Sequence, residues 1–158
     1  MKRLFSRAVI ATAVLACATI LSCGGDDDST GNAPTGSISG TITFRNTWPA
    51  SGNVYVTINS TYPPTGAPDA FTNPITPGLR TYDYTLGGIE TGTYVAVLIG
   101  WRGGPGNDKC IGMYWQFVDS LGIASDCSSQ TPGPSPVTVT RNATLNNVDM
   151  VADLSLAP

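Results

Sequence analysis

The stretch that decides the fold is TYDYTLGGIETGTYVAVLIGW, residues 81–101. At its start Tyr82, Tyr84 and Leu86 alternate with three polar residues, which predicts a strand buried on one face. The segment 87–92 (GGIETG) has the composition of a turn. The run 93–101 is apolar almost throughout, which predicts a second strand at the centre of a sheet, buried on both faces. These features together predict two strands joined by a glycine-rich turn.

The same period of two extends in both directions from this stretch. It is seen at 37–45 (SISGTITFR), 53–59 (NVYVTIN), 137–139 and 148–154, with turn residues between the runs, and 110–118 (CIGMYWQFV) is a further β-rich run. No segment of twelve or more residues after residue 22 has a period of 3.6, and the best helical candidate is a turn near 119–124. We therefore predict an all-β, antiparallel β-sandwich of about seven strands over residues 37–158. The proline-rich stretch 61–78 and the stretch 103–136 are expected to be loops or edge structure.

The phrase Tyr82–Val97, with its Gly-Ile-Glu-Thr-Gly-Thr-Tyr core, resembles the strand–turn–strand hairpin of carboxypeptidase-regulatory-like and transthyretin-like domains. The opening Ser37–Phe44 is similar to the first strand of that family, and Val137–Leu154 resembles its closing pair of strands. This resemblance implies a transthyretin-like or immunoglobulin-like sandwich with a non-catalytic accessory role. The segment 103–136 has no counterpart in the usual module and is expected to be an insertion.

The composition excludes several classes of activity. The 158 residues contain no histidine, which removes Ser-His-Asp and Cys-His catalysis and histidine-ligated zinc. The net charge of −3 argues against nucleic-acid binding. We expect no enzyme activity, no cofactor and no metal.

The first residues resemble the signal of a bacterial lipoprotein. Three basic residues precede the apolar run Ala8–Leu21, and Ile20-Leu21-Ser22-Cys23 resembles a lipobox. The resemblance implies a signal peptide over 1–22, which would form a helix, and a lipid on Cys23, including a palmitate-type acyl chain. Val14-Leu15-Ala16-Cys17 also satisfies the pattern and remains an alternative. Gly24 after the cysteine, where aspartate would favour the inner membrane, points to the outer membrane.

Residues 23–36 are predicted to be a lipidated, flexible, disordered tether because GGDDDSTGNAPTG (24–36) cannot build a core. Loss of residues 1–22 removes three bases and no acids, so the mature chain carries five basic and eleven acidic residues, a net charge of −6. Cys110 and Cys127 then form an even pair in an oxidising compartment. We predict a disulfide between them.

Candidate binding residues are aromatic. Trp101, Tyr114 and Trp115, together with Trp48 and Phe117, are predicted either to fill the core or to form a platform that stacks on a sugar ring or a partner. A cation held by Asn107-Asp108 with Asp119 or Asp126 is a weaker alternative.

The sequence thus predicts a lipid-anchored, non-enzymatic protein of the bacterial cell envelope with a structural or interaction role. The alternative is a carbohydrate- or ligand-binding lipoprotein that uses aromatic residues at loop ends. Expected partners are the membrane, through the N-terminal lipid, and an envelope protein or glycan.

Overall fold

The computed structural model describes residues 33–115 and 133–157. Contacts divide the chain into the units Met1–Gly31 and Asn32–Pro158, and the description that follows concerns the second. The signal peptide, Cys23, most of the tether, the turn near 119–124, Phe117 and Cys127 lie outside the described residues. Within them the fold is all-β, as predicted, with ten mostly short strands in place of about seven.

Sheet A is built around the first long strand. β1 (Thr35–Arg45) pairs antiparallel with β4 (Thr81–Glu90) along one edge. Along its other edge it pairs with β9 (Thr144–Leu145) and then β10 (Met150–Asp153). Both of these pairings are parallel, so the expectation of a wholly antiparallel sandwich is wrong at this edge. A parallel partner must reach β1 by a crossover connection.

Sheet B has the order β3-β2-β6-β7 and is antiparallel throughout. Its strands are β2 (Asn53–Asn59), β3 (Ala70–Phe71), β6 (Ala96–Arg102) and β7 (Asp108–Met113). β3 supplies the edge structure expected within the proline-rich stretch. β7 lies inside the predicted insertion, which is therefore part of the sheet and not an appendage to it.

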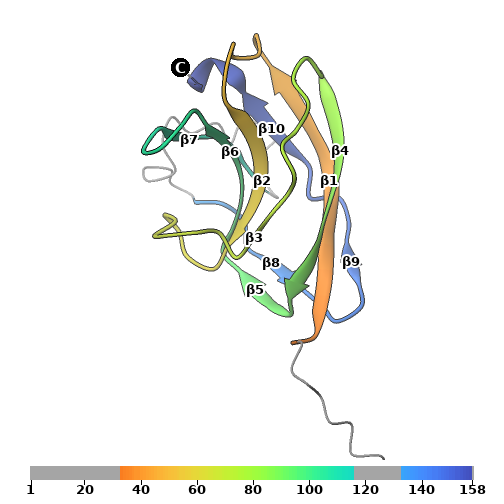
Figure 1. Cartoon of the computed structure of the whole chain (residues 1–158). Coiled ribbons are helices and arrows are strands. Elements are labelled where there is room, and N and C mark those ends of the chain that lie inside the picture. Colours follow the sequence, from red (N-terminus) through yellow and green to blue (C-terminus); the bar gives the residue numbers. More distant parts are fainter. Residues whose placement is uncertain (1–32, 116–132, 158) are drawn as a thin grey trace, which may run out of the picture. The chain divides into compact units, whose positions relative to one another are not determined.

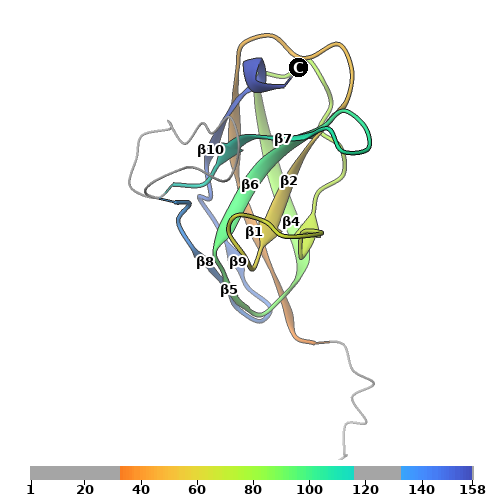
Figure 2. The same ribbon diagram turned by 90° about the vertical axis from the view of Figure 1, so that its left-hand side faces the viewer.

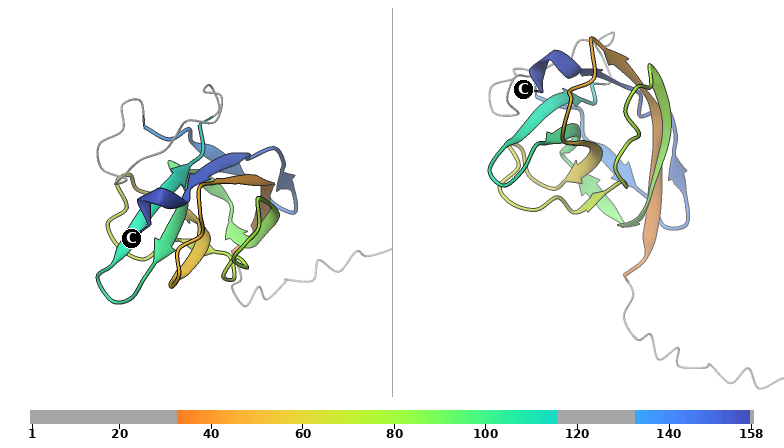
Figure 3. Two further views of the ribbon diagram at one scale, coloured as in Figure 1. Left: turned by 90° about the horizontal axis from the view of Figure 1, so that it is seen from above. Right: turned by 45° about the horizontal axis from the view of Figure 1, so that its top comes forward.

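The two sheets face each other, as Figures 1 and 2 show, with the core between them when the molecule is viewed from above in Figure 3. The inward residues alternate along each strand as predicted: Ile38, Ile42, Phe44, Tyr84, Leu86, Met150 and Ala152 come from sheet A, and Val54, Val56, Ile58, Val97, Ile99 and Trp101 from sheet B. The 3-10 helix η1 (Leu154–Leu156) adds Leu154 to this core.

A small third sheet lies at the opposite end of the sandwich from η1 (Figure 1). It pairs β5 (Gly92–Tyr94) with β8 (Val137–Val139). Tyr94 folds back so that its hydroxyl donates to the carbonyl of Glu90 at 2.9 Å. This is the geometry of a tyrosine corner, which fixes the chain where it passes from one sheet to the other. The apolar run 93–101 is consequently divided at Val95, which is 37% exposed, and only β6 is a central strand.

The predicted turn at 87–92 is wrong, because β4 continues to Glu90. Leu86 pairs with Ile38 and Ile89 with Gly36, so two residues of β4 oppose one of β1. This is a β-bulge, and Gly88 occupies it with φ of +70°. The extra residue shifts the alternation, so that Leu86 and Ile89 both point into the core.

The C-terminal segment comes very close to β1 at Gly40. Val148, between β9 and β10, is 1% exposed; its N–H donates to the carbonyl of Ser39 at 3.0 Å, and its carbonyl accepts from the Tyr84 hydroxyl at 2.8 Å. A Cβ at Gly40 would lie 2.2 Å from the Val148 carbonyl oxygen. Only glycine at position 40 allows this contact.

Gly40→Ala is therefore expected to destabilise the protein by about 2–3 kcal/mol, because the new methyl meets backbone that cannot rotate away. Gly87→Ala is the matched control: its Cβ would have no neighbour nearer than 4.0 Å. Urea unfolding of both variants measures the difference. Equal stability of the two variants would contradict the contact.

Burial, with Asp149 nearby, raises the pKa of Tyr84 well above its usual range. An unfolded tyrosine ionises near pH 10. Tyr84 keeps its proton in the folded state at that pH, so its contribution to stability is constant below about pH 10 and falls as the pH rises further. Tyr84→Phe is expected to cost about 1–2 kcal/mol at pH 7 and to make the alkaline decline shallower. Urea unfolding between pH 7 and 11 tests this, with Tyr82→Phe, half-buried on the same strand, as control.

Candidate functional site

A groove of about 780 Å³ lies on the outer face of sheet B, away from the core. We call it the sheet B groove; its floor consists of outward-facing residues of β2 and β6, chiefly Tyr55, Thr57 and Gly100. The loop 60–69 passes in front of these strands in Figure 2 and supplies Pro64 and Pro68 to the rim. The volume of the groove falls within the range of small-molecule sites.

The aromatic wall of the groove is formed by Tyr55 and Phe71. Their ring centroids are 6.3 Å apart with an interplanar angle of 84°, an edge-to-face pair. Phe71 is 61% exposed, more than any other large apolar residue among the described residues. β3 holds it in place, because the pairing of Thr57 with Phe71 fixes the register of that edge strand.

The loop in front of the groove is closed by Asp69. Its carboxylate accepts from the backbone N–H of Ser60 at 2.6 Å and from the Ser60 hydroxyl at 3.3 Å, while its own N–H donates to the carbonyl of Ile58 at 3.0 Å. These bonds join the two ends of the loop. Asp69 therefore shapes the rim of the groove.

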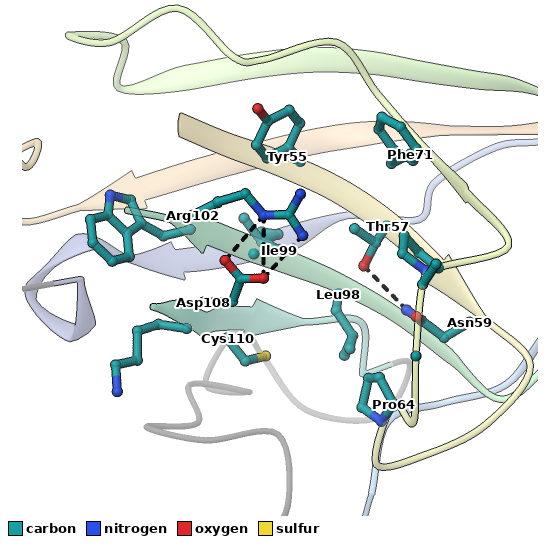
Figure 4. A pocket seen from close by; sticks show the side chains of 16 residues that line it. Tyr55, Thr57, Asn59, Pro64, Phe71, Leu98, Ile99, Arg102, Asp108 and Cys110 are labelled. Atoms are coloured by element: carbon teal, nitrogen blue, oxygen red, sulfur yellow. Dashed lines mark hydrogen bonds and ion pairs between the residues drawn. The ribbon is translucent and has the colours of Figure 1, made fainter. Parts of the chain in front are cut away.

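The charged wall is an ion pair between Arg102 and Asp108 (Figure 4). The guanidinium donates from Nε to both carboxylate oxygens, at 3.1 and 3.2 Å, and from Nη2 to one of them at 3.0 Å. The two residues are direct cross-strand neighbours on β6 and β7, at the mouth of the turn 103–107. The hydrogen bond to Asp108 raises the pKa of Arg102.

The centre of the floor is open because Gly100 has no side chain. A Cβ there would meet nothing nearer than the Lys109 carbonyl at 3.9 Å. On one side of it, Ala96, Leu98, Cys110 and Met113 form a second apolar cluster with Tyr62 and Trp115. On the same floor Asn59 is 5% exposed, and its amide Nδ2 donates to Thr57 Oγ1 at 3.1 Å. The groove thus combines apolar, amide, hydroxyl and charged groups.

Of the two alternatives for the aromatic candidates, packing in the core is the one that Trp101 adopts. Trp101 is 3% exposed, packs in the core and donates its indole N–H to the Ser51 carbonyl at 3.0 Å. Although Trp101 also borders the groove, its burial leaves no face for stacking. The turn 103–107 is closed by the Gly103 N–H, which donates to the Asn107 carbonyl at 3.0 Å, and Gly103 is needed there because a Cβ would lie 2.0 Å from the Trp101 ring.

The other aromatic candidates have different surroundings. Tyr114 packs against the main core, where burial raises its pKa, and Trp115 packs against the second cluster. Trp48 lies 4.7 Å from Phe44, ring centroid to ring centroid, and donates its N–H to the Leu79 carbonyl at 2.8 Å. The structure does not bring these rings together in one surface.

Within residues 33–115 and 133–157, no group of three or more carboxylate or thiol ligands is placed to hold a metal ion. Asp108, proposed as a cation ligand, binds Arg102 instead, and Asp119 and Asp126 lie outside the described residues. Cys110 is buried on β7, while its predicted partner Cys127 is outside the described residues, so the disulfide stays a prediction. No helix in the described part is long and apolar enough to cross a membrane.

Comparison with known proteins returned no matching family model, no matching curated protein and no matching solved structure.

Sequence reasoning missed Tyr55, Phe71 and the Arg102–Asp108 pair as site residues. In the sequence, Tyr55 is the one aromatic residue among the alternate, otherwise polar positions of the segment 53–59. Arg102 and Asp108 flank a glycine-rich turn, so their pairing followed from the hairpin. Phe71 gave no signal, because its position depends on how the proline-rich stretch folds back onto β2.

Proposed function

We propose that this protein is a lipid-anchored component of the bacterial cell envelope with a structural or interaction role. The observation that carries the proposal is the N-terminal sequence: a basic start, an apolar run, Leu21-Ser22-Cys23 and a polar, acidic tether. The acyl chains on Cys23 would together give stable attachment, since each buried methylene contributes about 0.8 kcal/mol. Gly24 favours the outer membrane.

A non-catalytic role is supported by what the acidic residues do in the folded domain. Each of five described carboxylates accepts hydrogen bonds from the chain itself: Asp69 from Ser60, Asp83 and Asp149 from Thr41, Asp108 from Arg102, and Asp153 from Ser155 and Asn46. The bonds from Ser155 are the main reason that the pKa of Asp153 is lowered. Carboxylates engaged in this way hold turns and strand ends together, and the sequence offers no histidine as a general base.

The folded domain is suited to display at the end of a tether. β1 begins at Thr35, and its first residues lie at the β5–β8 end of the sandwich (Figure 1). The sheet B groove occupies a face of the sandwich and not that end. A transthyretin-like accessory domain of this kind acts by contact with an envelope protein or a glycan.

Lipid attachment is tested by expressing the full chain in a bacterium that processes lipoproteins and feeding it an alkyne analogue of palmitate. We expect labelling of the wild type and of Cys17→Ala, and loss of label in Cys23→Ala, because the thiol is the attachment point. Label that persists in Cys23→Ala and disappears in Cys17→Ala would move the anchor to Cys17. An unlabelled wild type would reject the anchor.

The disulfide proposed between Cys110 and Cys127 is tested by intact mass of the exported protein before and after reduction. We expect the mass of the protein to increase by two hydrogen atoms on reduction, and we expect neither cysteine to be alkylated before reduction. Loss of the bond in Cys127→Ser is expected to cost about 3 kcal/mol, because the unfolded chain regains the entropy of an open loop. Two alkylated thiols in the native protein would contradict the pairing.

A further inference from the structure

We propose that the sheet B groove is a carbohydrate-binding site, with Tyr55 and Phe71 packing on a sugar ring and the Arg102–Asp108 pair hydrogen-bonding to its hydroxyls. The rings that it uses, Tyr55 and Phe71, are not Trp101, Tyr114 or Trp115, although Trp101 borders the groove. It names a ligand class for the interaction role proposed above, yet it does not require the lipid anchor.

The groove combines aromatic rings with exposed polar side chains, which are the groups that bind a sugar. A sugar ring has an apolar face of C–H groups and a rim of hydroxyls, and it is bound by an aromatic ring together with planar polar side chains. Here Phe71 is 61% exposed beside Tyr55, and the guanidinium and carboxylate are 63% and 54% exposed. Figure 4 shows the rings and the ion pair on the same face of sheet B.

The strands that form the floor of the groove have no free edge for an extended peptide. Such a peptide needs a strand edge with unpaired N–H and C=O groups. The floor of the groove consists of β2, which lies between β3 and β6, and β6, which lies between β2 and β7. Both strands are already paired on both sides, so recognition there must use side chains.

The charged residues that line the groove are largely neutralised by one another. Asp108 already neutralises Arg102 through three hydrogen bonds, which leaves Lys109 at the rim as the remaining charge among the lining residues. An ion pair of this kind can donate to one hydroxyl from the guanidinium and accept from another at the carboxylate without a net change in charge. The pair therefore suits the hydroxyls of a neutral oligosaccharide; because Lys109 leaves the lining with one net positive charge, the test includes an acidic sugar.

The floor of the groove has room for a sugar ring above Gly100. Gly100 lies in the floor between the two walls, paired with Tyr55 on β2 and with Cys110 on β7. Its missing side chain leaves room for a ring without any close contact with the backbone. This makes position 100 the place where the groove can be filled without disturbing the fold.

The test uses the full chain in detergent and four neutral hexasaccharides: gluco-, manno-, xylo- and chito-oligosaccharides, titrated and followed by saturation-transfer NMR. A hyaluronan hexasaccharide, as an acidic sugar, and a panel of extended peptides are titrated in the same way for comparison. We expect at least one neutral hexasaccharide to bind, with contact to aromatic protons. Phe71→Ala should weaken that binding about tenfold, and Gly100→Leu should abolish it.

Leu145→Ala is the matched control, since Leu145 is an exposed apolar residue on sheet A, and its affinity should equal that of the wild type. Phe71→Ala removes an exposed ring, so it keeps the test valid if Gly100→Leu does not fold. The proposal is overturned if no neutral hexasaccharide binds up to about 10 mM, if only the acidic sugar or a peptide binds, or if both groove variants bind like the wild type. Labelling at Cys23 is read separately, so failure here leaves the anchor proposal unaffected.

Discussion

The C-terminal third of the fold depends on the close contact between Gly40 and Val148. β9 and β10 follow the same edge of β1, but four residues, 146–149, span the distance that three residues cover on β1. The extra residue is accommodated by Asn147 at φ of +63°, which turns Val148 into the core over Gly40. Ser39 and the Tyr84 hydroxyl then bind both polar groups of its peptide unit. A side chain at position 40 would separate β10 from β1.

This arrangement explains why sheet B has an exposed outer face. With η1 contacting β1 and β7, and β10 lying against β7, the C-terminal segment closes the core between the sheets and does not cross sheet B's outer surface. That surface is covered on one side by the cluster of Leu98, Met113 and Tyr62. Among the described residues nothing covers the rest at Gly100, so the groove lies over a central strand whose apolar residues face both ways.

Much of the fold could be predicted from period-two alternation, because Ile38, Ile42 and Phe44 have one face to bury and no competing pattern. The errors in the predicted fold concern residues that are compatible with two backbone conformations. Gly87-Gly88 indicates a turn by composition, whereas here it forms a bulge, and only the pairing of Leu86 and Ile89 with β1 distinguishes the two. Trp101 shares the parity of Val97 and Ile99, so alternation itself places it inside. Phe71 is fixed by non-local pairing with β2, which no local pattern reveals.

Phe71 and the Arg102–Asp108 pair contribute little to folding, and this separates them from aromatic residues such as Trp101 and Tyr84. An ion pair as exposed as that of Arg102 and Asp108 adds at most about 1 kcal/mol. A ring as exposed as that of Phe71 gains little from burial, and exposed apolar surface on an edge strand favours aggregation. Trp101 and Tyr84, in contrast, are buried and hydrogen-bonded to backbone. Side chains that the fold does not need, gathered over an open floor, are what a binding surface requires.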